Sequence, residues 1–482
     1  MKRLSFLSLV ALTGCTLGPR HVTTTLSQSP AVAPQTIASA AGPAQTIVPG
    51  APVPPAWWTE FRSASLDALV TQALSANTDI ASAEATLRQV RAQTRIAQAA
   101  GLPQADASYQ YDRAHVSNAL SSPLADTNDT LYSLHTAQLS VTYPLDLFGA
   151  QRARVRSARA AAEVAQDRLL AARTTVVANL VLAVIQHAAL VDEVAATQSS
   201  IDSNRRIVGL LQRRQQLGDI GLVDVGAQQT VLANAEAALP PLQRQLAHQA
   251  GLIATLTGHA PGSVAPDLPT LAALRLPDQL PVALPAQIVA GRPDVRAAEA
   301  VMRGAGADVN AAIAARLPSI TLSGNAGGSS TRFTDMFASG NPFYTLIGGI
   351  TQPLFRAGAL KGAQRVAEAA LEGAKAAYRG AALQAFLDVD DALSGLRSDA
   401  VALDAAARAE QAASQTLMFT RRQLELGGVG TLQLLNASAA SAQASSALVQ
   451  ARAARLTDTV ALYQATGGGV TIPPSPGETP RP

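Results

Sequence analysis

The sequence predicts a chain that is mainly α with a transmembrane β part and is internally duplicated. Alanine dominates a composition with 15% charged and 4% aromatic residues, which suits closely packed helices because Ala has the highest helix propensity. Two long stretches lack proline, and two pairs of short segments alternate between apolar and polar residues. A chain of 482 residues can also bury a large core.

The first residues are typical of a bacterial lipoprotein signal. A short basic start precedes an apolar run that is too short to cross a membrane as a helix. The run ends in Leu-Thr-Gly-Cys at Cys15, which resembles the lipobox. The sequence therefore predicts a signal peptide over residues 1–14 and lipidation of Cys15, with an ordinary signal peptide and a chance cysteine as the alternative. The absence of Asp after Cys15 favours the outer membrane.

Two proline-rich stretches flank the body of the chain. Residues 15–56 lack a helical period and predict an extended, lipidated tether. Residues 468–482 predict a disordered tail. No segment after the signal peptide has about 18 consecutive apolar residues. A membrane crossing would therefore require a β-barrel.

The body is an internal duplication. The first matches share an offset of 215 residues, for example Leu102-Pro103 with Leu317-Pro318. Later matches share an offset of 209 residues, for example Thr257-Gly258 with Thr466-Gly467. The drop in offset indicates one loop that is six residues longer in the first copy. The predicted structural repeats cover residues 57–283 and 284–467.

Alternating segments in each repeat predict two hairpins, at about 104–143 and about 319–352. Strands of about 10 residues, apolar on one face and polar on the other, are typical of transmembrane barrels. A soluble β-hairpin domain is the alternative. The apolar positions are Ala107, Tyr109, Tyr111, Ala137, Leu139, Val141, Tyr143, Ile320, Leu322, Tyr344, Leu346 and Ile350.

Long helices follow each hairpin. Residues 150–217 and 359–426 contain no proline, and helices of that length extend about 100 Å. Return helices are predicted over about 222–258 and 432–466, with a break or kink at Pro240-Pro241 in the first. Antiparallel helices this long need neighbours along their whole length.

Four strands per chain cannot close a barrel. Open strand edges in lipid leave backbone groups unsatisfied, at several kcal/mol each. Subunits must therefore share one barrel, and the smallest bacterial single-chain barrels have about 8 strands. The strand count alone allows either two or three subunits. The Ala-rich helices would continue the wall as a long α-helical barrel.

The motifs resemble those of TolC-like outer-membrane factors, and more narrowly the NodT-type lipoproteins of resistance-nodulation-division efflux pumps. The resemblance covers about residues 57–467 and rests on the duplication, the lipobox and three sequence runs. These runs are Leu-Asp-Leu-Phe-Gly at 145–149, Gly-Arg-Pro-Asp-Val-Arg-Ala-Ala-Glu at 291–299 and Gln-Pro-Leu-Phe at 352–355.

The resemblance implies a homotrimer with a shared twelve-stranded β-barrel in the outer-membrane lipid and a long α-helical barrel in the periplasm. It implies two partners, a periplasmic membrane-fusion (adaptor) protein and an inner-membrane resistance-nodulation-division pump. The implied function is a passive exit duct for small molecules in a tripartite efflux system. Two alternatives are a type I protein-secretion exit duct and a coiled lipoprotein scaffold without a pore.

In that family the helix-turn-helix tips carry the docking and gating residues. The resemblance implies adaptor docking at Gly218, Ile220, Gly221, Leu222, Gly427, Val429, Gly430 and Thr431. Glycine suits tight turns with positive φ, although helix termination alone also explains such glycines.

The entrance gate would comprise Asp224, Gln433, Asn436, Arg213, Arg421 and Arg422. Because Gln433 and Asn436 stand where the family often has acids, the second copy departs from the family's pattern, and the resemblance does not imply strong cation selectivity. The tip arginines could pair with Asp219, Asp224 or Glu425, or remain solvated charges worth little each.

Catalytic and nucleotide-binding motifs are missing from the sequence. It contains no His-Glu-x-x-His, Gly-x-Ser-x-Gly or Walker motif. The six histidines lack metal-ligand spacing, and we interpret the acidic cluster at 388–391 as a water-facing stripe. The formal net charge of +3 is small for a nucleic-acid-binding chain. We expect no enzyme activity, no cofactor or metal, and no nucleic-acid partner.

Overall fold

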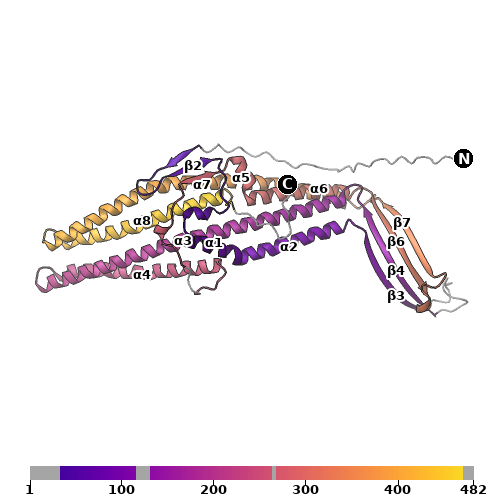
Figure 1. Ribbon diagram of the computed structural model, residues 1–482, viewed down its shortest axis with the longest axis horizontal. Helices are drawn as coiled ribbons and strands as arrows, with labels where there is room; N and C mark the ends of the chain where they lie inside the picture. Colours follow the sequence, from indigo (N-terminus) through magenta and orange to yellow (C-terminus); the bar gives the residue numbers. More distant parts are fainter. Residues whose placement is uncertain (1–32, 116–130, 263–266, 470–482) are drawn as a thin grey trace. The chain divides into compact units, whose positions relative to one another are not determined.

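A computed structural model describes residues 33–115, 131–262 and 267–469 (Figure 1). The predicted signal peptide, Cys15 and most of the predicted tail lie outside the described residues. The chain divides into two compact units. The strand unit comprises residues 87–165 and 298–378, and the tip unit comprises the described parts of 26–86, 166–297 and 379–482.

A four-stranded antiparallel sheet forms the β part of the strand unit, as the predicted fold class requires. Its order is β3-β4-β6-β7, so the central pairing of β4 with β6 joins the two repeats. The outer strands β3 and β7 each pair on one side only within the described residues. The bounds are β3 (Gln104–His115), β4 (Leu131–Leu145), β6 (Ser319–Ser330) and β7 (Pro342–Thr351).

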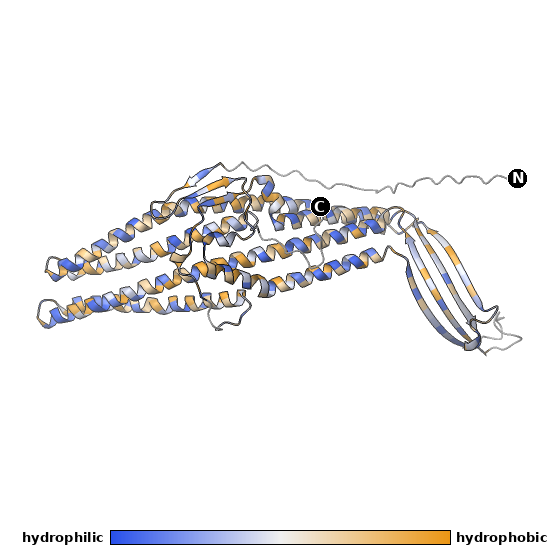
Figure 2. Ribbon diagram, in the orientation of Figure 1, coloured by the Kyte–Doolittle hydropathy of each residue, from blue (hydrophilic) through white to orange (hydrophobic). Residues whose placement is uncertain are grey.

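The strand register places the alternating apolar residues on one face of this sheet. Leu139 lies opposite Ala107 on one side and Ala326 on the other, and Ala326 lies opposite Tyr344. Successive residues in a strand point to opposite faces, so the intervening Ser, Thr, Gln and Asn residues share the other face. Figure 2 shows the hydropathy alternating along the strands. The apolar side chains are largely exposed, with Tyr344 at 86%. Within the described part of the chain, one apolar face of the sheet is therefore uncovered and the outer edges of β3 and β7 are unpaired.

The helices show the same duplication. In each repeat a 22-residue helix precedes the hairpin, a 67-residue helix follows it, and a 35-residue helix returns. These are α2 (Thr78–Ala99), α3 (Ala150–Gln216) and α4 (Leu222–Leu256) in the first repeat, and α6 (Pro293–Ala314), α7 (Ala359–Glu425) and α8 (Thr431–Ala465) in the second. Further helical segments are η1 (Trp57–Phe61), α1 (Ala64–Ala76), η2 (Leu271–Ala273), α5 (Pro285–Gly291) and η3 (Phe333–Asp335).

Of the break or kink predicted at Pro240-Pro241, the break is absent, because α4 continues through both prolines as one helix. A proline removes one backbone hydrogen bond, and the remaining turns of this long helix hold it together.

Helix α3 contains an 18-residue window that is long and apolar enough to cross a membrane, and 67% of that window is buried. Such burial is typical of a core helix, and α3 supplies core residues such as Val177, Leu180 and Val181.

Part of the predicted extended tether over 15–56 forms strands that pair with each other and with the body of the chain, and we call residues 33–50 the strap. The strap contains β1 (Gln35–Ile37) and β2 (Gln45–Pro49), and β2 pairs in parallel with β5 (Gln279–Val282). Arg455 donates to Pro43 O at 2.7 Å and to Gln45 Oε1 at 3.2 Å. Asp404 accepts from Ser39 Oγ at 2.7 Å. These partners lie over 230 residues away in the sequence, so local composition did not reveal them.

An acidic pair lies close to Arg455, the residue that contacts the strap. Asp399 of α7 and Asp458 of α8 are hydrogen-bonded, and Arg455 is close to Asp399. Burial raises the pKa of Asp399 to about 6, reinforced by the charge of Asp458 and the hydrogen bond to it and opposed by Arg455. Burial also raises the pKa of Asp458. The pair therefore retains a proton that the unfolded chain releases near pH 4.

We expect the thermal stability to fall as the pH rises through about 6, because a raised carboxyl pKa stabilises the folded state only while the proton is bound. The effect should be about 1–2 kcal/mol between pH 4 and pH 7.5, since partial exposure reduces the full shift. Asp399→Asn should flatten the melting temperature against pH, whereas Asp390→Asn, at an exposed position of α7, should not. Equal pH slopes in wild type and Asp399→Asn would contradict this assignment.

Candidate functional site

Two hairpin turns form the tips of the tip unit. In the first turn Gly218 N donates to Gln215 O at 3.0 Å and Asp219 N donates to Arg214 O at 2.9 Å. The second turn repeats this pattern with Gly427 and Gly428 as donors. Gly218 and Gly427 have φ of 82° and 77°, the left-handed conformation that ends a helix in a Schellman motif. The same local chemistry therefore reverses the chain in both repeats.

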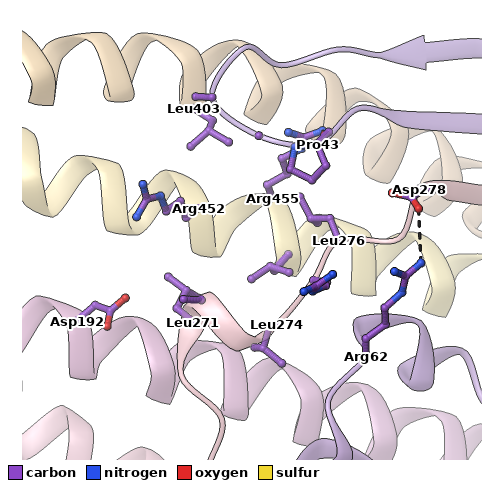
Figure 3. Close-up of a pocket in the computed structure, with 15 residues that line it drawn as sticks. Pro43, Arg62, Asp192, Leu271, Leu274, Leu276, Asp278, Leu403, Arg452 and Arg455 are labelled. Atoms are coloured by element: carbon purple, nitrogen blue, oxygen red, sulfur yellow. Dashed lines mark hydrogen bonds and ion pairs between the residues drawn. The ribbon is translucent and has the colours of Figure 1, made fainter.

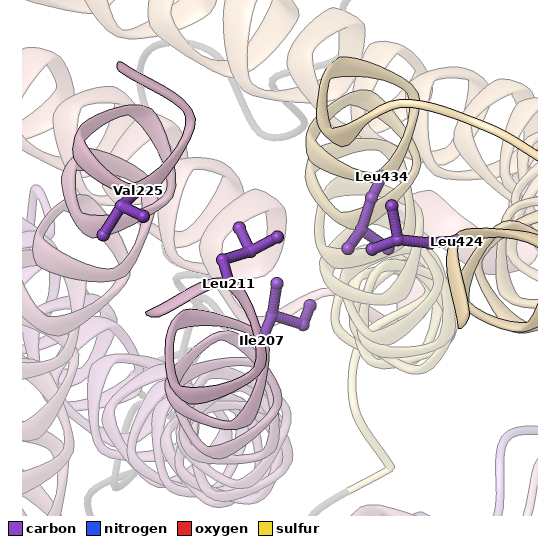
Figure 4. Packing of buried hydrophobic residues seen from close by; sticks show 5 residues of the cluster. All are labelled: Ile207, Leu211, Val225, Leu424 and Leu434. Atoms are coloured by element: carbon purple, nitrogen blue, oxygen red, sulfur yellow. The ribbon is translucent and has the colours of Figure 1, made fainter. Parts of the chain in front are cut away.

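A small apolar cluster lies between the two hairpins just behind the turns. Figure 4 shows its members: Ile207, Leu211, Val225, Leu424 and Leu434. Residues from both repeats contribute, so the cluster holds the two tips together. Ile220 and Val429 pack against it from the turns.

The predicted docking residues divide into two groups. Ile220 and Val429 contact the apolar cluster, and Thr431 is 6% exposed. The remaining docking residues, which are Gly218, Gly221, Leu222, Gly427 and Gly430, are exposed in the chain. The first group packs in the interior of the tip and the second group is exposed, and a docking role stays a prediction for both groups.

Large apolar side chains surround the exposed turn glycines, and we call them the tip rim. The tip rim comprises Leu217, Leu222, Val223, Leu426 and Leu432, each at least 65% exposed. The sequence prediction named only Leu222 among them. The other members could have been predicted from the sequence, because each is a large apolar residue close to a turn glycine. Exposed apolar groups gathered at one place are typical of a protein interaction site.

The predicted gate residues also differ in burial and in their contacts. Arg214, which flanks the gate set, forms an ion pair with Asp219 at 3.5 Å and donates to Leu424 O of the other hairpin at 3.3 Å. Arg421 is half-buried and donates to Ser203 Oγ. Burial lowers the pKa of Arg421, as does the nearby charge of Arg206. Asp224 is half-buried, whereas Arg213, Arg422, Gln433 and Asn436 are exposed.

A buried polar cluster, missed in the sequence, connects three helices behind the tips. Asn204 Oδ1 of α3 accepts from Gln228 Nε2 of α4 at 3.0 Å and from Ser438 Oγ of α8 at 3.1 Å. Asn204 and Gln228 are 1% and 0% exposed. Buried polar groups are costly unless hydrogen-bonded. Asn204 therefore holds the two hairpins at a defined distance from each other. No local sequence pattern indicates this role, because its partners come from both repeats.

Asn204→Ala should lower the free energy of unfolding by about 2 kcal/mol, because it leaves a buried amide and a buried hydroxyl without their acceptor. Chemical denaturation would measure the loss, and amide hydrogen exchange at 217–221 and 426–430 should become faster. Asn234→Ala removes an exposed asparagine from α4 and should change neither. Equal stabilities of the two variants would exclude a structural role for the Asn204 cluster.

Comparison with curated proteins finds relatives over most of the chain. The chain is 29% identical over 418 residues to the pyoverdine export outer membrane protein OpmQ of Pseudomonas putida, covering 86% of this chain and 88% of the relative. It is 29% identical over 469 residues to the toluene efflux pump outer membrane protein TtgC of Pseudomonas putida, covering 95% and 93%.

Solved structures share the fold. The outer-membrane channel OprN is 25% identical, with a TM-score of 0.84 over 94% of this chain and 99% of that channel. The CmeC outer membrane channel of Campylobacter jejuni is 20% identical, with a TM-score of 0.86 over 95% of each chain. The model of the outer membrane efflux protein family matches residues 69–259 and 284–468. From the duplication, the amphipathic sheet and these matches, the chain belongs to the outer membrane efflux protein family.

Proposed function

We propose that three copies of this outer-membrane efflux channel share one twelve-stranded β-barrel. The observation that carries the proposal is the sheet of the strand unit, with its exposed apolar face and its open edges at β3 and β7. In lipid, unpaired strand edges cost several kcal/mol per backbone group. Pairing β3 of one copy with β7 of the next would satisfy both edges and close the barrel.

The molar mass of the detergent-purified protein, measured by light scattering and corrected for detergent, tests this proposal. A value three times that of the 49.5 kDa chain, less the signal peptide, is expected. Conductance in a planar bilayer should then accompany the trimer. A monomer that persists across several detergents would overturn the shared barrel, because four strands cannot close on themselves.

The tips are the proposed docking site of a periplasmic adaptor protein, which would connect the channel to an inner-membrane resistance-nodulation-division pump. The exposed tip rim and turn glycines support this proposal, since apolar contacts and close backbone approach suit a partner hairpin. Leu222→Asp and Leu432→Asp should abolish efflux while the trimer and its bilayer conductance persist. Loss of the trimer itself would instead indicate a structural role for these side chains.

Small molecules are the proposed cargo. Two relatives are named for pyoverdine export and toluene efflux, compounds that differ widely in polarity. Such a range suggests that the duct selects little and that the pump supplies both selection and energy. Deletion of the chain in its host should raise sensitivity to several unrelated compounds, and loss of a single secreted protein with unchanged sensitivity would contradict efflux.

The proposed lipid anchor is Cys15. Cys15→Ser should abolish acylation, measured as the loss of the lipid mass from the mature protein. The barrel is itself an anchor, so part of the variant should still fractionate with the outer membrane. A fully soluble, monomeric variant would contradict the barrel rather than the lipidation.

A further inference from the structure

A cavity of about 600 Å³ lies within the tip unit, between the strap and the helices α3, α7 and α8. Its walls include the connector between the two repeats, at residues 271–278. Figure 3 shows Leu271 and Leu274 of this connector on one side and Pro43 of the strap with Leu403 on the other. The volume is within the range of about 300–1,000 Å³ that small-molecule sites occupy. The tip residues and the sheet do not contribute to it.

The polar part of the wall is rich in guanidinium groups. Arg62, Arg275, Arg452 and Arg455 line the cavity, together with the two acids Asp192 and Asp278. Asp278 forms an ion pair with Arg62 at 3.6 Å. Asp192 is then the remaining acid of the lining, against Arg275, Arg452 and Arg455, so the lining carries a net positive charge.

Two of these arginines have no protein partner for their guanidinium groups. Among the described residues, Arg275 and Arg452 form no ion pair or side-chain hydrogen bond. Both are exposed and come from different elements, the connector and α8. Arg455 is instead fully buried and held by the strap through Pro43. The cavity lining therefore contains one arginine held by hydrogen bonds, Arg455, and two exposed arginines, Arg275 and Arg452, that are available to a ligand.

The wall is held in place by contacts that tolerate little rearrangement. Arg62 has a left-handed backbone, with φ of 53°, which costs a side-chain-bearing residue about 1–2 kcal/mol. Arg275 N donates to Phe61 O at 3.0 Å beside it. Strained residues of this kind persist where the surrounding structure determines them, and they are frequent at ligand clamps.

We propose that this cavity binds an amphipathic organic anion, whose carboxylate or phosphate head pairs with Arg275 and Arg452. The apolar body of the ligand contacts Leu271, Leu274, Leu276 and Leu456, which line the same cavity. Guanidinium groups recognise carboxylate and phosphate oxygens in a planar, often bidentate geometry. This site shares no lining residue with the tips or the four-stranded sheet.

Two probe molecules that differ only in their head group test whether the cavity prefers an anionic or a cationic ligand. Octanoate and octylammonium carry the same apolar chain with opposite head groups, and titration calorimetry would compare them on the full-length protein in lipid nanodiscs. Empty nanodiscs supply the reference for partition into lipid. Saturable binding of octanoate, at least tenfold tighter than that of octylammonium, is expected.

Variants assign the binding to the cavity. Arg275→Glu combined with Arg452→Glu should weaken octanoate at least tenfold, whereas Asp192→Asn should strengthen it. Arg244→Glu removes an exposed arginine of α4 outside the cavity and should leave affinity unchanged. Because these arginines are exposed, the variants should keep the molar mass of the wild type.

Three results would overturn the proposal. The first is the absence of saturable octanoate binding at millimolar concentration, which would show that the arginines are solvated charges. The second is equal binding of the two probes, which would indicate partition by apolar contact alone. The third is an equal loss of binding in the cavity variant and in Arg244→Glu, which would indicate a diffuse charge effect.

Discussion

Gly258→Ala is expected to lower the free energy of unfolding by about 3 kcal/mol, from backbone strain and a steric clash together. Gly258 has φ of 81°, and an added Cβ would lie 2.7 Å from Ala76 O. Both the end of α4 and the end of α1 would have to move. The loss should appear as a lower denaturant midpoint of the full-length protein in detergent.

Two further glycines separate the strain from the clash. Gly262 has φ of 85° with no heavy atom within 4 Å of an added Cβ, so Gly262→Ala should cost about 1 kcal/mol from strain alone. Gly467, which corresponds to Gly258 in the second repeat, would place its Cβ 3.3 Å from Gly291 O. Its variant should give an intermediate loss. Equal losses at all three positions would show that the clash contributes nothing.

Arg292→Ala should lower the free energy of unfolding by about 3 kcal/mol, because it leaves a partly buried carboxylate and a helix end without their partner. Arg292 has an 11% exposed side chain and bonds Asp388 at 2.8 Å, Asp294 at 2.7 Å and Ala465 O at 3.1 Å. It thus joins α6, α7 and α8. The ion pair with Asp388 places one member of the acidic cluster at 388–391 in a structural contact.

The first repeat supplies a comparison for this variant. Asn77 occupies the position equivalent to Arg292 and donates to Leu256 O at 3.0 Å, the residue equivalent to Ala465. Asn77 also caps α2 by accepting from Asp79 N and Ile80 N. Asn77→Ala should cost about 1–2 kcal/mol, typical of a lost cap. Denaturation of both variants tests this order, and a smaller loss in Arg292→Ala than in Asn77→Ala would contradict it.

A second control isolates the unpaired charge. Arg292→Ala combined with Asp388→Ala should be more stable than Arg292→Ala alone, since the carboxylate left by the first change is then removed. Additive losses in the double variant would instead indicate that Arg292 acts mainly through Ala465 O. Hydrogen exchange at the end of α8 would distinguish the two contacts.

The tips illustrate how far the sequence predicted the candidate site. The turn glycines were identified because Gly at a left-handed position is a local requirement, met within a few residues of the turn. Ile220 and Val429, which the sequence predicts as docking residues, are partly buried and also pack on the apolar cluster between the hairpins. Their burial depends on Leu424 and Leu211, which belong to different repeats, and a local pattern does not contain that information.

The sequence by itself determined the features that repeat locally. Alternation assigned the two faces of each strand, the proline-free runs gave two helices of 67 residues, and the constant offsets revealed the duplication. Each follows from backbone geometry acting over a few neighbouring residues.

The tertiary structure alone decided which distant segments meet. It paired β4 with β6 across the repeats, added β2 of the strap to β5, and placed Gln228 and Ser438 on Asn204. It also showed α4 continuing through Pro240-Pro241. These outcomes depend on partners up to hundreds of residues away, since the free energy of pairing and burial belongs to both members of a contact and cannot be assigned from either one.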